Sequence, residues 1–268
     1  IAMSDWSSDV CSSDLGKKMA AKEKFRIVVS EEDHDVILSI CDTLNSLSDP
    51  KDQNGFSFNV KEDRLIISVY RCRNSFSSFE VALKTTSLDE EKLLALNALF
   101  RKCILEFQYD SDKNEIVISL PEEYTHTKEV QLDNSNENQE KISCIIALRK
   151  PFPMLKHIVS LLNLIKIKKV LTINQRILSI SAIGRNIAIN VKAHVLRYEN
   201  MNLPAFCSKF NYLSALGLAD FDFEVLNLNS SAELLQVTVF VPEDEDRRKK
   251  YYETVELLNS ISSFNEHE

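Results

Sequence analysis

The chain has 268 residues, of which 44% are hydrophobic and 27% charged, and its formal net charge is −8. These fractions are typical of a globular protein with one large core or two modest ones, and the negative charge argues against nucleic acid binding over the whole surface. Only four glycines are present, which argues against glycine-rich phosphate loops, and no apolar run reaches the roughly 18 residues of a membrane span.

The first residues are set apart as an artefactual or disordered tail, residues 1–18. Residues 6–15 resemble the translation of a sequencing adapter, so we expect the natural product to begin at Met19. A terminal segment rich in serine and aspartate would be disordered in any case. Residues before Met19 are therefore not expected to contribute to the fold.

The first repeated unit is predicted from residue 25 onward. A strand at residues 25–29 leads to Ser30, an N-cap candidate followed by acidic residues that favour the start of a helix. Apolar residues then recur at helical spacing through Leu47, and breaker residues end the helix. Three strands are predicted after it, at residues 56–60, 64–70 and 76–83.

A second, shorter unit follows. Ser87 and Glu90 form a capping box for a helix over residues 88–103. Strands are predicted at 104–109 and 115–120, joined by a polar hairpin loop. This unit has fewer strands than the first.

A change to polar composition at residues 121–141 predicts an exposed connector between two halves. The third unit has a strand at 142–148, a helix at 154–165 and three alternating apolar runs that end at Val195. The fourth has a helix at 204–219 and strands at 221–228 and 234–241. The repeated order predicts an α+β fold with two similar domains, residues 19–120 and 142–242.

The end of the chain, residues 243–268, is predicted to form a charged helix and tail. Four acids at 243–246 precede four bases at 247–250, and each acid lies four residues before a base. That spacing is typical of ion pairs on a helix surface. The basic run could alternatively be a nuclear-localisation or nucleic-acid-binding segment.

No nucleotide-binding, zinc-protease or serine-hydrolase motif is found in the sequence. His34 follows three acidic residues, but neighbouring residues of one helix turn point in different directions and cannot converge on a metal ion. We therefore expect no catalytic residues, no metal and no cofactor. An enzyme with a dispersed site is kept as a weaker hypothesis.

The cysteines after Met19 are five in number, widely separated and without a Cys-x-x-Cys pair. Each lies among apolar neighbours, which predicts reduced core thiols in a nuclear or cytoplasmic protein. These residues are Cys41, Cys72, Cys103, Cys144 and Cys207.

Basic residues on the predicted helices are the candidates for DNA contact. If the four helices lined one surface, these side chains could neutralise phosphates without reading base sequence. A solvated helix face explains each of them equally well. The candidate residues are Lys92, Arg101, Lys102, Lys156 and Lys209.

The four units, two on each side of a polar connector, resemble the DNA sliding clamp superfamily, and most of all the subunits of the heterotrimeric DNA-damage checkpoint clamp. The match is clearest over residues 142–195, including the pattern at 170–182, and at the last strand, 236–242, which is followed by acids. The sequence departs from the clamp pattern where units two and four lack a strand, where the first helix is acidic, and where a charged helix follows the last strand.

This resemblance implies two clamp-like domains with helices on one face of antiparallel sheets. It implies a non-enzymatic subunit of a nuclear ring that encircles double-stranded DNA without sequence specificity, in DNA-damage checkpoint signalling or repair. Other clamp-like subunits would be its partners, and peptide motifs of further proteins would dock near residues 121–141. The alternative is an α+β scaffold or adaptor subunit of a kinetochore or transcription complex, without DNA contact.

Overall fold

The computed structural model describes residues 24–48, 54–71, 77–86, 88, 90–100, 105–121, 139–149, 155–166, 168–199, 202–226 and 232–265. Over these residues the protein has a mixed α+β fold, and every strand pairing between its named strands is antiparallel. The predicted α+β class is therefore confirmed.

The two halves of the chain have the same order of elements, strand-helix-three strands-helix-two strands. The N-terminal half contains β1 (Lys24–Val28), α2 (His34–Leu47), β2 (Asn54–Lys61), β3 (Arg64–Arg71), β4 (Ser78–Lys84), α3 (Glu90–Phe100), β5 (Glu106–Asp110) and β6 (Glu115–Ser119). The C-terminal half contains β7 (Lys141–Arg149), α4 (Leu155–Leu164), β8 (Lys168–Asn174), β9 (Ile177–Ile183), β10 (Ile187–Glu199), α5 (Leu203–Ala215), β11 (Asp220–Leu226) and β12 (Ala232–Phe240). Helix α6 (Glu245–Asn265) follows the second half.

Two helix ends differ from the sequence prediction. The N-cap of α2 is Asp33, whose side chain accepts from the backbone of Asp35 and Val36, and not Ser30. Ser30 instead lies two residues after the end of β1 and donates its backbone N–H to Lys84 O at 2.9 Å. Helix α5 ends at Ala215, earlier than predicted, because Gly217 adopts a positive φ that terminates it.

Strand pairing repeats between the halves as closely as the element order does. In the first half the strands pair in two groups, in the orders β1-β6-β5 and β2-β3-β4. In the second half the equivalent groups have the orders β7-β12-β11 and β8-β9-β10. Each half therefore joins two three-stranded groups of the same connectivity.

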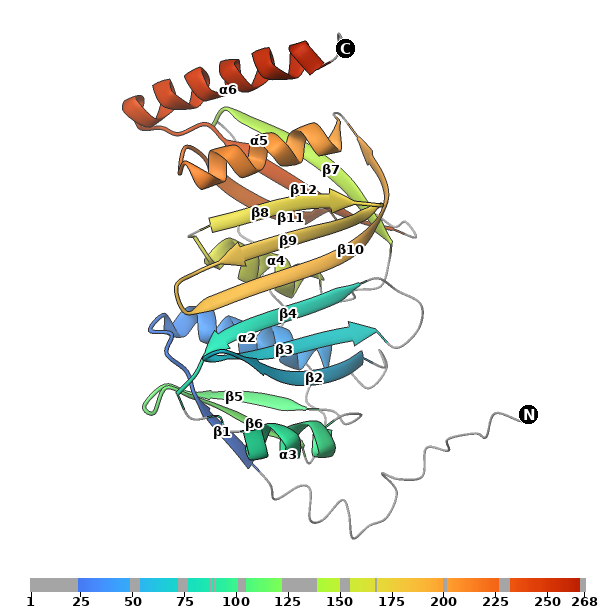
Figure 1. The fold of residues 1–268 in the computed structure, drawn as a ribbon, viewed down its shortest axis with the longest axis vertical. Helices are drawn as coiled ribbons and strands as arrows, with labels where there is room; N and C mark the ends of the chain where they lie inside the picture. The colour runs from blue at the N-terminus through green and yellow to red at the C-terminus, as the bar shows by residue number, and fades with distance from the viewer. Residues whose placement is uncertain are drawn as a thin grey trace, which may run out of the picture.

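The halves meet through their equivalent strands β4 and β10 (Figure 1), which pair from Leu83 opposite Ile187 to Ser78 opposite Lys192. This pairing makes one continuous sheet in the order β2-β3-β4-β10-β9-β8. Behind it the equivalent helices α2 and α4 pack against each other. The two halves thus contact each other through a pair of equivalent strands and through a pair of equivalent helices.

Strand β10 also explains the missing strand of the fourth unit. Its end bends past Val195 and pairs with β7, so the first strand of unit four is present but is continuous with the last strand of unit three. In unit two the equivalent position holds, among the residues that the structure describes there, a single bridge between Val29 and Thr85. The prediction that units two and four lack a strand is therefore wrong for unit four.

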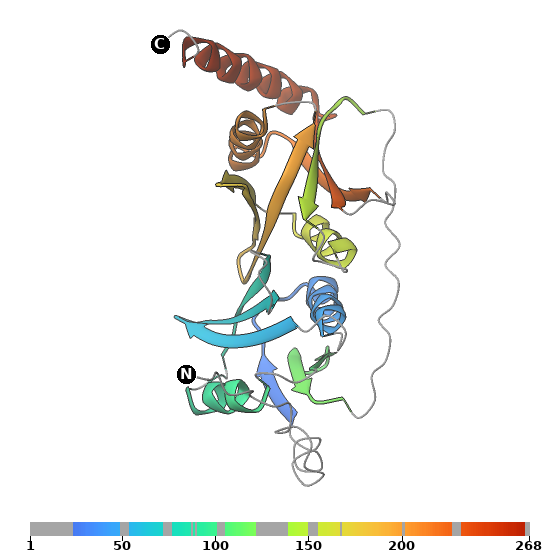
Figure 2. The same ribbon diagram turned by 90° about the vertical axis from the view of Figure 1, so that its right-hand side faces the viewer.

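The helices lie in two layers and not on one face (Figure 2). Helices α2 and α4 lie together on one side of the molecule, while α3 and α5 lie on the other side near its two ends. The reason is that the two helices of each half cover different sheets: α2 packs on β5 and α3 on β2, and α4 packs on β11 and α5 on β8.

An asparagine ties each of these four helices to the strand beneath it. In every case the side-chain amide donates to the carbonyl and accepts from the N–H of a single strand residue, at distances between 2.7 and 3.0 Å. The four pairs are Asn45 of α2 with Phe107 of β5, Asn97 of α3 with Phe58 of β2, Asn163 of α4 with Phe223 of β11, and Asn211 of α5 with Leu171 of β8.

These contacts are reciprocal within each half. Helix α2 binds β5, which is the first strand after α3. Helix α3 in turn binds β2, which is the first strand after α2. The same exchange occurs between units three and four. Backbone groups at a sheet edge that a helix covers must be hydrogen-bonded, and the asparagine supplies both partners at once.

The core is apolar and contains the described thiols. Cys41, Cys144 and Cys207 are buried, and burial raises the pKa of these thiols to about 12, about 11 and about 12 respectively. The prediction of core thiols is confirmed for these three, while Cys72 and Cys103 lie outside the described residues.

Candidate functional site

The predicted DNA-contact residues fall on three helices. Lys92 is exposed on α3, Lys156 is exposed on α4, and Lys209 is half-buried on α5. Arg101 and Lys102 lie outside the described residues, as do residues 122–138 of the predicted peptide-docking connector. The structure therefore places three of the five candidate basic residues.

These three lysines are not brought together on one surface. Helix α4 lies in the same layer as α2, whereas α3 and α5 lie in the other layer at opposite ends of the molecule (Figure 2). A DNA-binding surface formed by all five basic residues would require the four helices to share one face. The helical periodicity of the sequence does not determine in which layer a helix lies. Among them, only Lys156 belongs to the central α2–α4 pair.

The α2–α4 pair is a packing junction with mixed charge. The Thr43 hydroxyl lies 3.5 Å from His157 O across the junction, and both residues are buried. Burial lowers the pKa of His157, and the nearby Asp42 carboxylate opposes that shift. Exposed Asp42 and exposed Lys156 thus place both signs of charge on this face.

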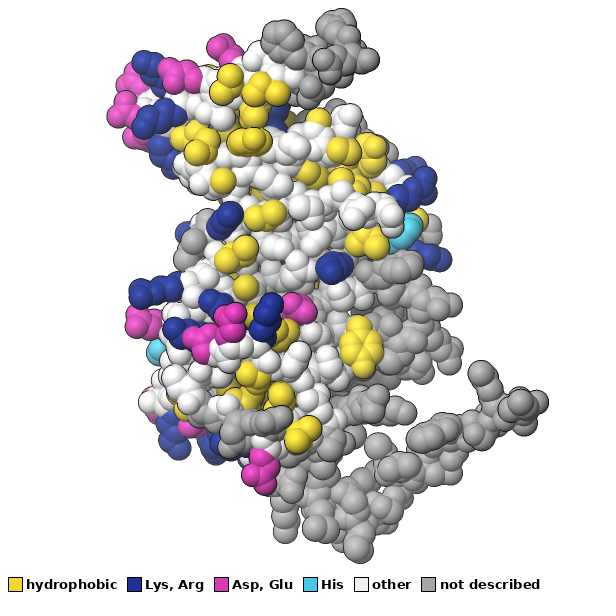
Figure 3. All heavy atoms as spheres, in the orientation of Figure 1, with side chains coloured by type: hydrophobic (Ala, Val, Ile, Leu, Met, Phe, Trp, Pro, Cys, Tyr) yellow, Lys and Arg dark blue, Asp and Glu magenta, His cyan; other side chains and the backbone are white. Residues whose placement is uncertain are grey.

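The continuous sheet also carries both signs of charge on its outward face (Figure 3). Lys84 lies 3.4 Å from Asp63, and Ser68 donates to Glu80 at 3.2 Å. The Arg64 guanidinium donates to Arg185 O at 3.1 Å and links the two halves. Interspersed charges of this kind do not make the single-sign field that attracts a polyanion.

Lys169 is a buried cation that the sequence analysis did not single out. Burial lowers its pKa to about 8, although Asp222 and Asp220 act in the opposite direction, and its ammonium lies 5.5 Å from the centre of the Phe223 ring. Burial likewise raises the pKa of the Asp222 carboxyl. A detectable signal was present, because Lys169 occupies an inward position in the alternation of β8.

A buried lysine beside a carboxyl group occurs in active sites and also in structural ion pairs. At Lys169 the chain supplies a cation–aromatic contact and a neighbouring acid, and its backbone N–H donates to Ser214 Oγ at 3.1 Å. This arrangement fixes the end of α5 against β8. It assigns Lys169 a packing role.

Helix α6 is confirmed, and its first turn is attached to the body of the protein. Asp244 caps it by accepting from Arg247 N at 2.9 Å. The Arg247 guanidinium donates twice to Gly217 O, at 3.2 and 3.0 Å, and lies 3.6 Å from Asp220. The predicted pair of Arg247 with Glu243 is therefore wrong, because residue 243 precedes the helix and Arg247 turns toward the α5–β11 loop.

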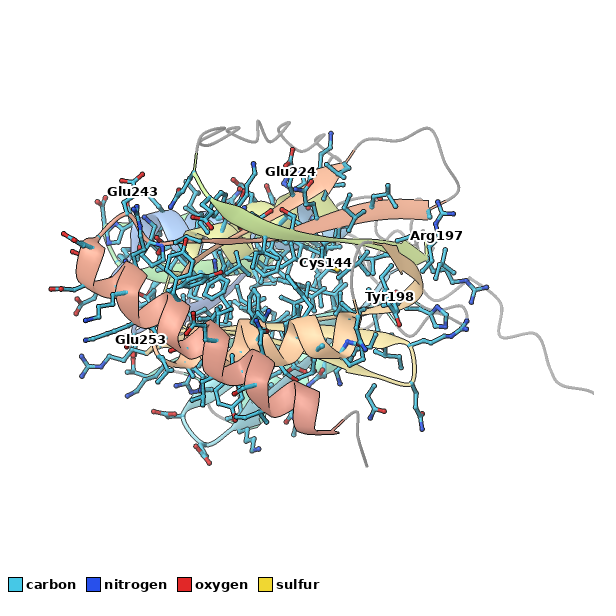
Figure 4. The ribbon with its side chains drawn as sticks, turned by 90° about the horizontal axis from the view of Figure 1, so that it is seen from above. Cys144, Arg197, Tyr198, Glu224, Glu243 and Glu253 are labelled. Atoms are coloured by element: carbon cyan, nitrogen blue, oxygen red, sulfur yellow. The ribbon has the colours of Figure 1, made fainter. Side chains whose placement is uncertain are left out.

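A second contact holds the middle of α6. The Tyr252 hydroxyl donates to a Glu140 carboxylate oxygen at 2.5 Å, and Tyr251 is buried. Viewed along the long axis, α6 lies over α5, with Glu243 at its beginning (Figure 4). Its basic run thus includes an arginine that attaches the helix to the body of the protein.

No group of three or more His, Cys, Asp or Glu side chains that could hold a metal ion occurs among the described residues. The ring of His34 instead packs edge-on against Tyr109, with centroids 5.6 Å apart. Among the residues described, no helix is long and apolar enough to cross a membrane.

Comparison of the chain with protein-family models gives no match, and no curated protein matches it. The repeated architecture and the surfaces described above are therefore the features of this chain that bear on its function.

Proposed function

We propose that the chain is a non-enzymatic, clamp-like subunit of a nuclear ring complex that encircles double-stranded DNA and recruits partners in DNA-damage checkpoint signalling or repair. The observation that carries the proposal is the fourfold repetition of one unit, with reciprocal asparagine contacts within each half. A chain of two equivalent halves is the building block that the clamp resemblance implies.

The junction between the halves supports an assembly role. Because β4 and β10 pair with each other, the two halves form one elongated body whose ends are left for neighbours (Figure 1). Other clamp-like subunits would attach at these ends, and peptide motifs of partner proteins would bind the assembled ring. The net charge of −8 limits any DNA contact to a local surface.

DNA contact in this proposal would be weak and independent of base sequence. Lys156, which is exposed on α4, is the described candidate that belongs to the central pair of helices α2 and α4. A DNA-encircling ring does not need tight binding by each subunit, because topology retains the ring on the duplex. The salt dependence of binding would report the number of phosphates neutralised.

The second candidate is an α+β scaffold subunit of another nuclear complex, such as a kinetochore or transcription assembly, without DNA contact. The specific observation in its favour is that Lys92, Lys156 and Lys209 lie on helices of two different layers. Repeated architecture is equally useful to a scaffold, since it presents similar surfaces at both ends.

Titration of labelled duplex DNA with the full chain at two salt concentrations separates the candidates. The clamp proposal expects salt-dependent binding that Lys156→Glu weakens more than Lys61→Glu, a change of another exposed lysine, on β2. With partner subunits present, a ring should remain on closed circular DNA and slide off linear DNA. Equal retention on both, together with no binding by the chain alone, would favour the scaffold.

A further inference from the structure

Basic and acidic residues are distributed unevenly along the chain. Residues 141–219 contain twelve Lys and Arg and a single acidic residue, Glu199, although the whole chain has a net charge of −8. The acids on the continuous sheet, Asp63 and Glu80, belong to its first half. Acidic side chains lie over the first half and over α6, but none lies over β8 and β9 (Figure 3). This part of the sheet therefore has the single sign of charge that attracts an anion.

The alternation of buried and exposed residues defines the outward face of β8, β9 and β10. Lys192 of β10 lies between two buried residues and therefore points outward. Lys168 of β8 is exposed and precedes a buried residue, so it points to the same side. Arg176 and Arg185 are exposed in the turns at the two ends of β9. Cations thus lie on this face and at both of its ends, and residues 168–198 include no acid.

The centre of this outward face presents hydrogen-bond donors. The side-chain nitrogen of Asn190 donates to Ser179 Oγ at 3.1 Å and to Ser181 Oγ at 2.7 Å. Because each serine oxygen accepts this bond, its own hydroxyl hydrogen remains for a further acceptor, and neither hydroxyl donates to another of the described residues. Lys192 lies directly opposite Ser179 in the pairing of β9 with β10. Two hydroxyls and an ammonium without a carboxylate are a donor set that suits phosphate oxygens.

The equivalent face of the first half has the opposite hydrogen-bond direction. The two strand residues that the asparagines of α3 and α5 bind occupy equivalent positions in β2 and β8. Followed across the paired strands from these positions, Glu80 of β4 corresponds to Asn190 of β10, and Ser68 corresponds to Ser181. Ser68 donates to the Glu80 carboxylate at 3.2 Å, whereas Ser181 accepts from Asn190. The serine hydroxyl is therefore used within the first half and left for a ligand in the second.

Two further equivalent positions differ in the same direction. Lys192 of β10 corresponds to Ala82 of β4, and Ser179 of β9 corresponds to Ile66 of β3. The second half thus has an ammonium, a hydroxyl and an amide where the first half has a methyl group, an apolar side chain and a carboxylate. All of these side chains point outward and are exposed or half-buried, so the packing of the core does not require the difference.

The spacing of the cations favours an extended polyanion over a single phosphate group. Lys168 and Lys192 are separated by two strand spacings across the sheet and by four residues along β10, which places them on the order of 15 Å apart. One phosphate cannot contact both, whereas duplex DNA presents phosphates on both sides of a major groove about 12 Å wide. The outward residues between the two lysines include no aromatic ring on which the bases of a single strand would stack.

We propose that the outward face of β8, β9 and β10 binds the phosphate backbone of double-stranded DNA. Lys168 and Lys192 neutralise phosphates, and the hydroxyls of Ser179 and Ser181 donate to phosphate oxygens. This inference rests on the DNA contact of the proposed function but places that contact on the sheet and not on α4, where Lys156 lies. It does not require a ring, so equal retention on circular and linear DNA would leave it standing.

An exchange of residues between the halves provides the first test. Asn190→Glu combined with Lys192→Ala gives the second half the side chains that the first half already has at these positions, so the fold should be retained, and thermal unfolding checks this. The full chain is titrated into labelled duplex DNA at several salt concentrations. The double variant should bind at least about ten-fold more weakly at low salt, and the slope of log affinity against log salt should decrease by about 1 for the lost ammonium.

Lys61→Glu on β2 is the matched control, because it changes the net charge by the same two units at an exposed residue of the first half. Equal weakening by both variants would mean that DNA responds to overall charge, and would overturn the proposal. Ser179→Ala combined with Ser181→Ala tests the hydroxyls separately. This variant should bind about ten-fold more weakly with an unchanged salt slope, since hydrogen bonds but no charges are removed. Unchanged affinity would contradict the assignment of the hydroxyls.

Competition experiments distinguish duplex DNA from other anions. The wild-type chain should prefer the duplex to a single strand of the same length, and polyglutamate should displace the duplex poorly. Preference for the single strand, or equal displacement by polyglutamate, would assign this face to another ligand. Absence of DNA binding by the chain alone would also contradict the inference, although a ring with partner subunits that stays on circular DNA would still support the clamp. Weakening by Lys156→Glu alone would support the clamp and exclude the sheet surface.

Discussion

Asn45 makes two hydrogen bonds to the backbone of one residue, Phe107, although 62 positions separate them in the sequence. Its side-chain nitrogen donates to Phe107 O at 2.8 Å, and its side-chain oxygen accepts from Phe107 N at 2.7 Å. At this one residue, Asn45 supplies the two hydrogen bonds that a neighbouring strand would otherwise make with the edge of β5. The same relationship in three more helices makes it a defining contact of the fold.

We expect Asn45→Ala to lower the free energy of unfolding by about 1–3 kcal/mol, because a buried N–H and a buried C=O of Phe107 lose their partners. Urea titration followed by circular dichroism measures the loss. The matched control is Asn174→Ala, which removes an exposed asparagine from β8. If both substitutions lowered the free energy of unfolding equally, the hydrogen bonds between Asn45 and Phe107 would contribute nothing specific to stability.

A pair of leucines in α2 tests which face of this helix is buried. Leu44→Ala should cost about 2–5 kcal/mol, because Leu44 is fully buried and its removal leaves a cavity. Leu38 is 50% exposed, so Leu38→Ala should cost less than about 0.5 kcal/mol. Thermal or urea unfolding of both variants gives the comparison. Similar losses would show that α2 is turned differently about its axis.

The order of helices and strands could be predicted from the sequence because it depends on local patterns. Alternation in β4 and helical spacing in α2 place these elements within a few residues of their observed bounds. The layer of each helix could not be predicted, since it depends on which distant strand the helix covers. The sequence therefore left open whether Lys92 of α3 and Lys156 of α4 share a surface, and the structure places these two helices in different layers.

The four asparagines that tie helices to strands were visible in the sequence but could be interpreted only with the structure. A polar residue inside a helix is usually assigned to the solvent face, and Asn45 stands directly beside the buried Leu44. The contact of Asn45 with the backbone of Phe107 explains why a polar side chain stands next to a buried leucine. Lys169 was missed for a similar reason, because a lysine in a strand is expected to point outward.

Lys169 should make stability depend on pH in the alkaline range. Its folded pKa, about 8, is lower than the 10.5 of an unperturbed lysine, so the unfolded chain binds more protons between these values and stability rises with pH there. The cost of burying the charge is fully present below pH 8. From pH 7 to pH 9 the wild type should gain about 1 kcal/mol relative to Lys169→Met.

Denaturant titrations of wild type and Lys169→Met at pH 7, 8 and 9 measure this gain as a difference, which cancels the titration of buried thiols in both proteins. Lys168→Met, a change of the exposed neighbour, serves as the control and should show no such trend. If the difference between wild type and Lys169→Met stays constant over this range, Lys169 does not titrate below its ordinary value.

Arg247 should determine how firmly α6 is attached. Its guanidinium makes two hydrogen bonds to Gly217 O and lies 3.6 Å from Asp220, at the loop that ends α5. Because this ion pair is partly exposed, most of the effect should come from the bonds to the carbonyl, and Arg247→Ala should destabilise the attachment by about 1 kcal/mol. Lys249→Ala removes an exposed cation two residues further along α6 and is the control.

Amide hydrogen exchange across residues 245–265 measures the attachment directly. Arg247→Ala should accelerate exchange throughout α6 by about five-fold, the value that corresponds to about 1 kcal/mol, while exchange in β4 and β10 stays unchanged. Faster exchange in those strands as well would indicate global destabilisation. Unchanged exchange in α6 would mean that Tyr252 and the buried Tyr251 hold the helix without help from the arginine.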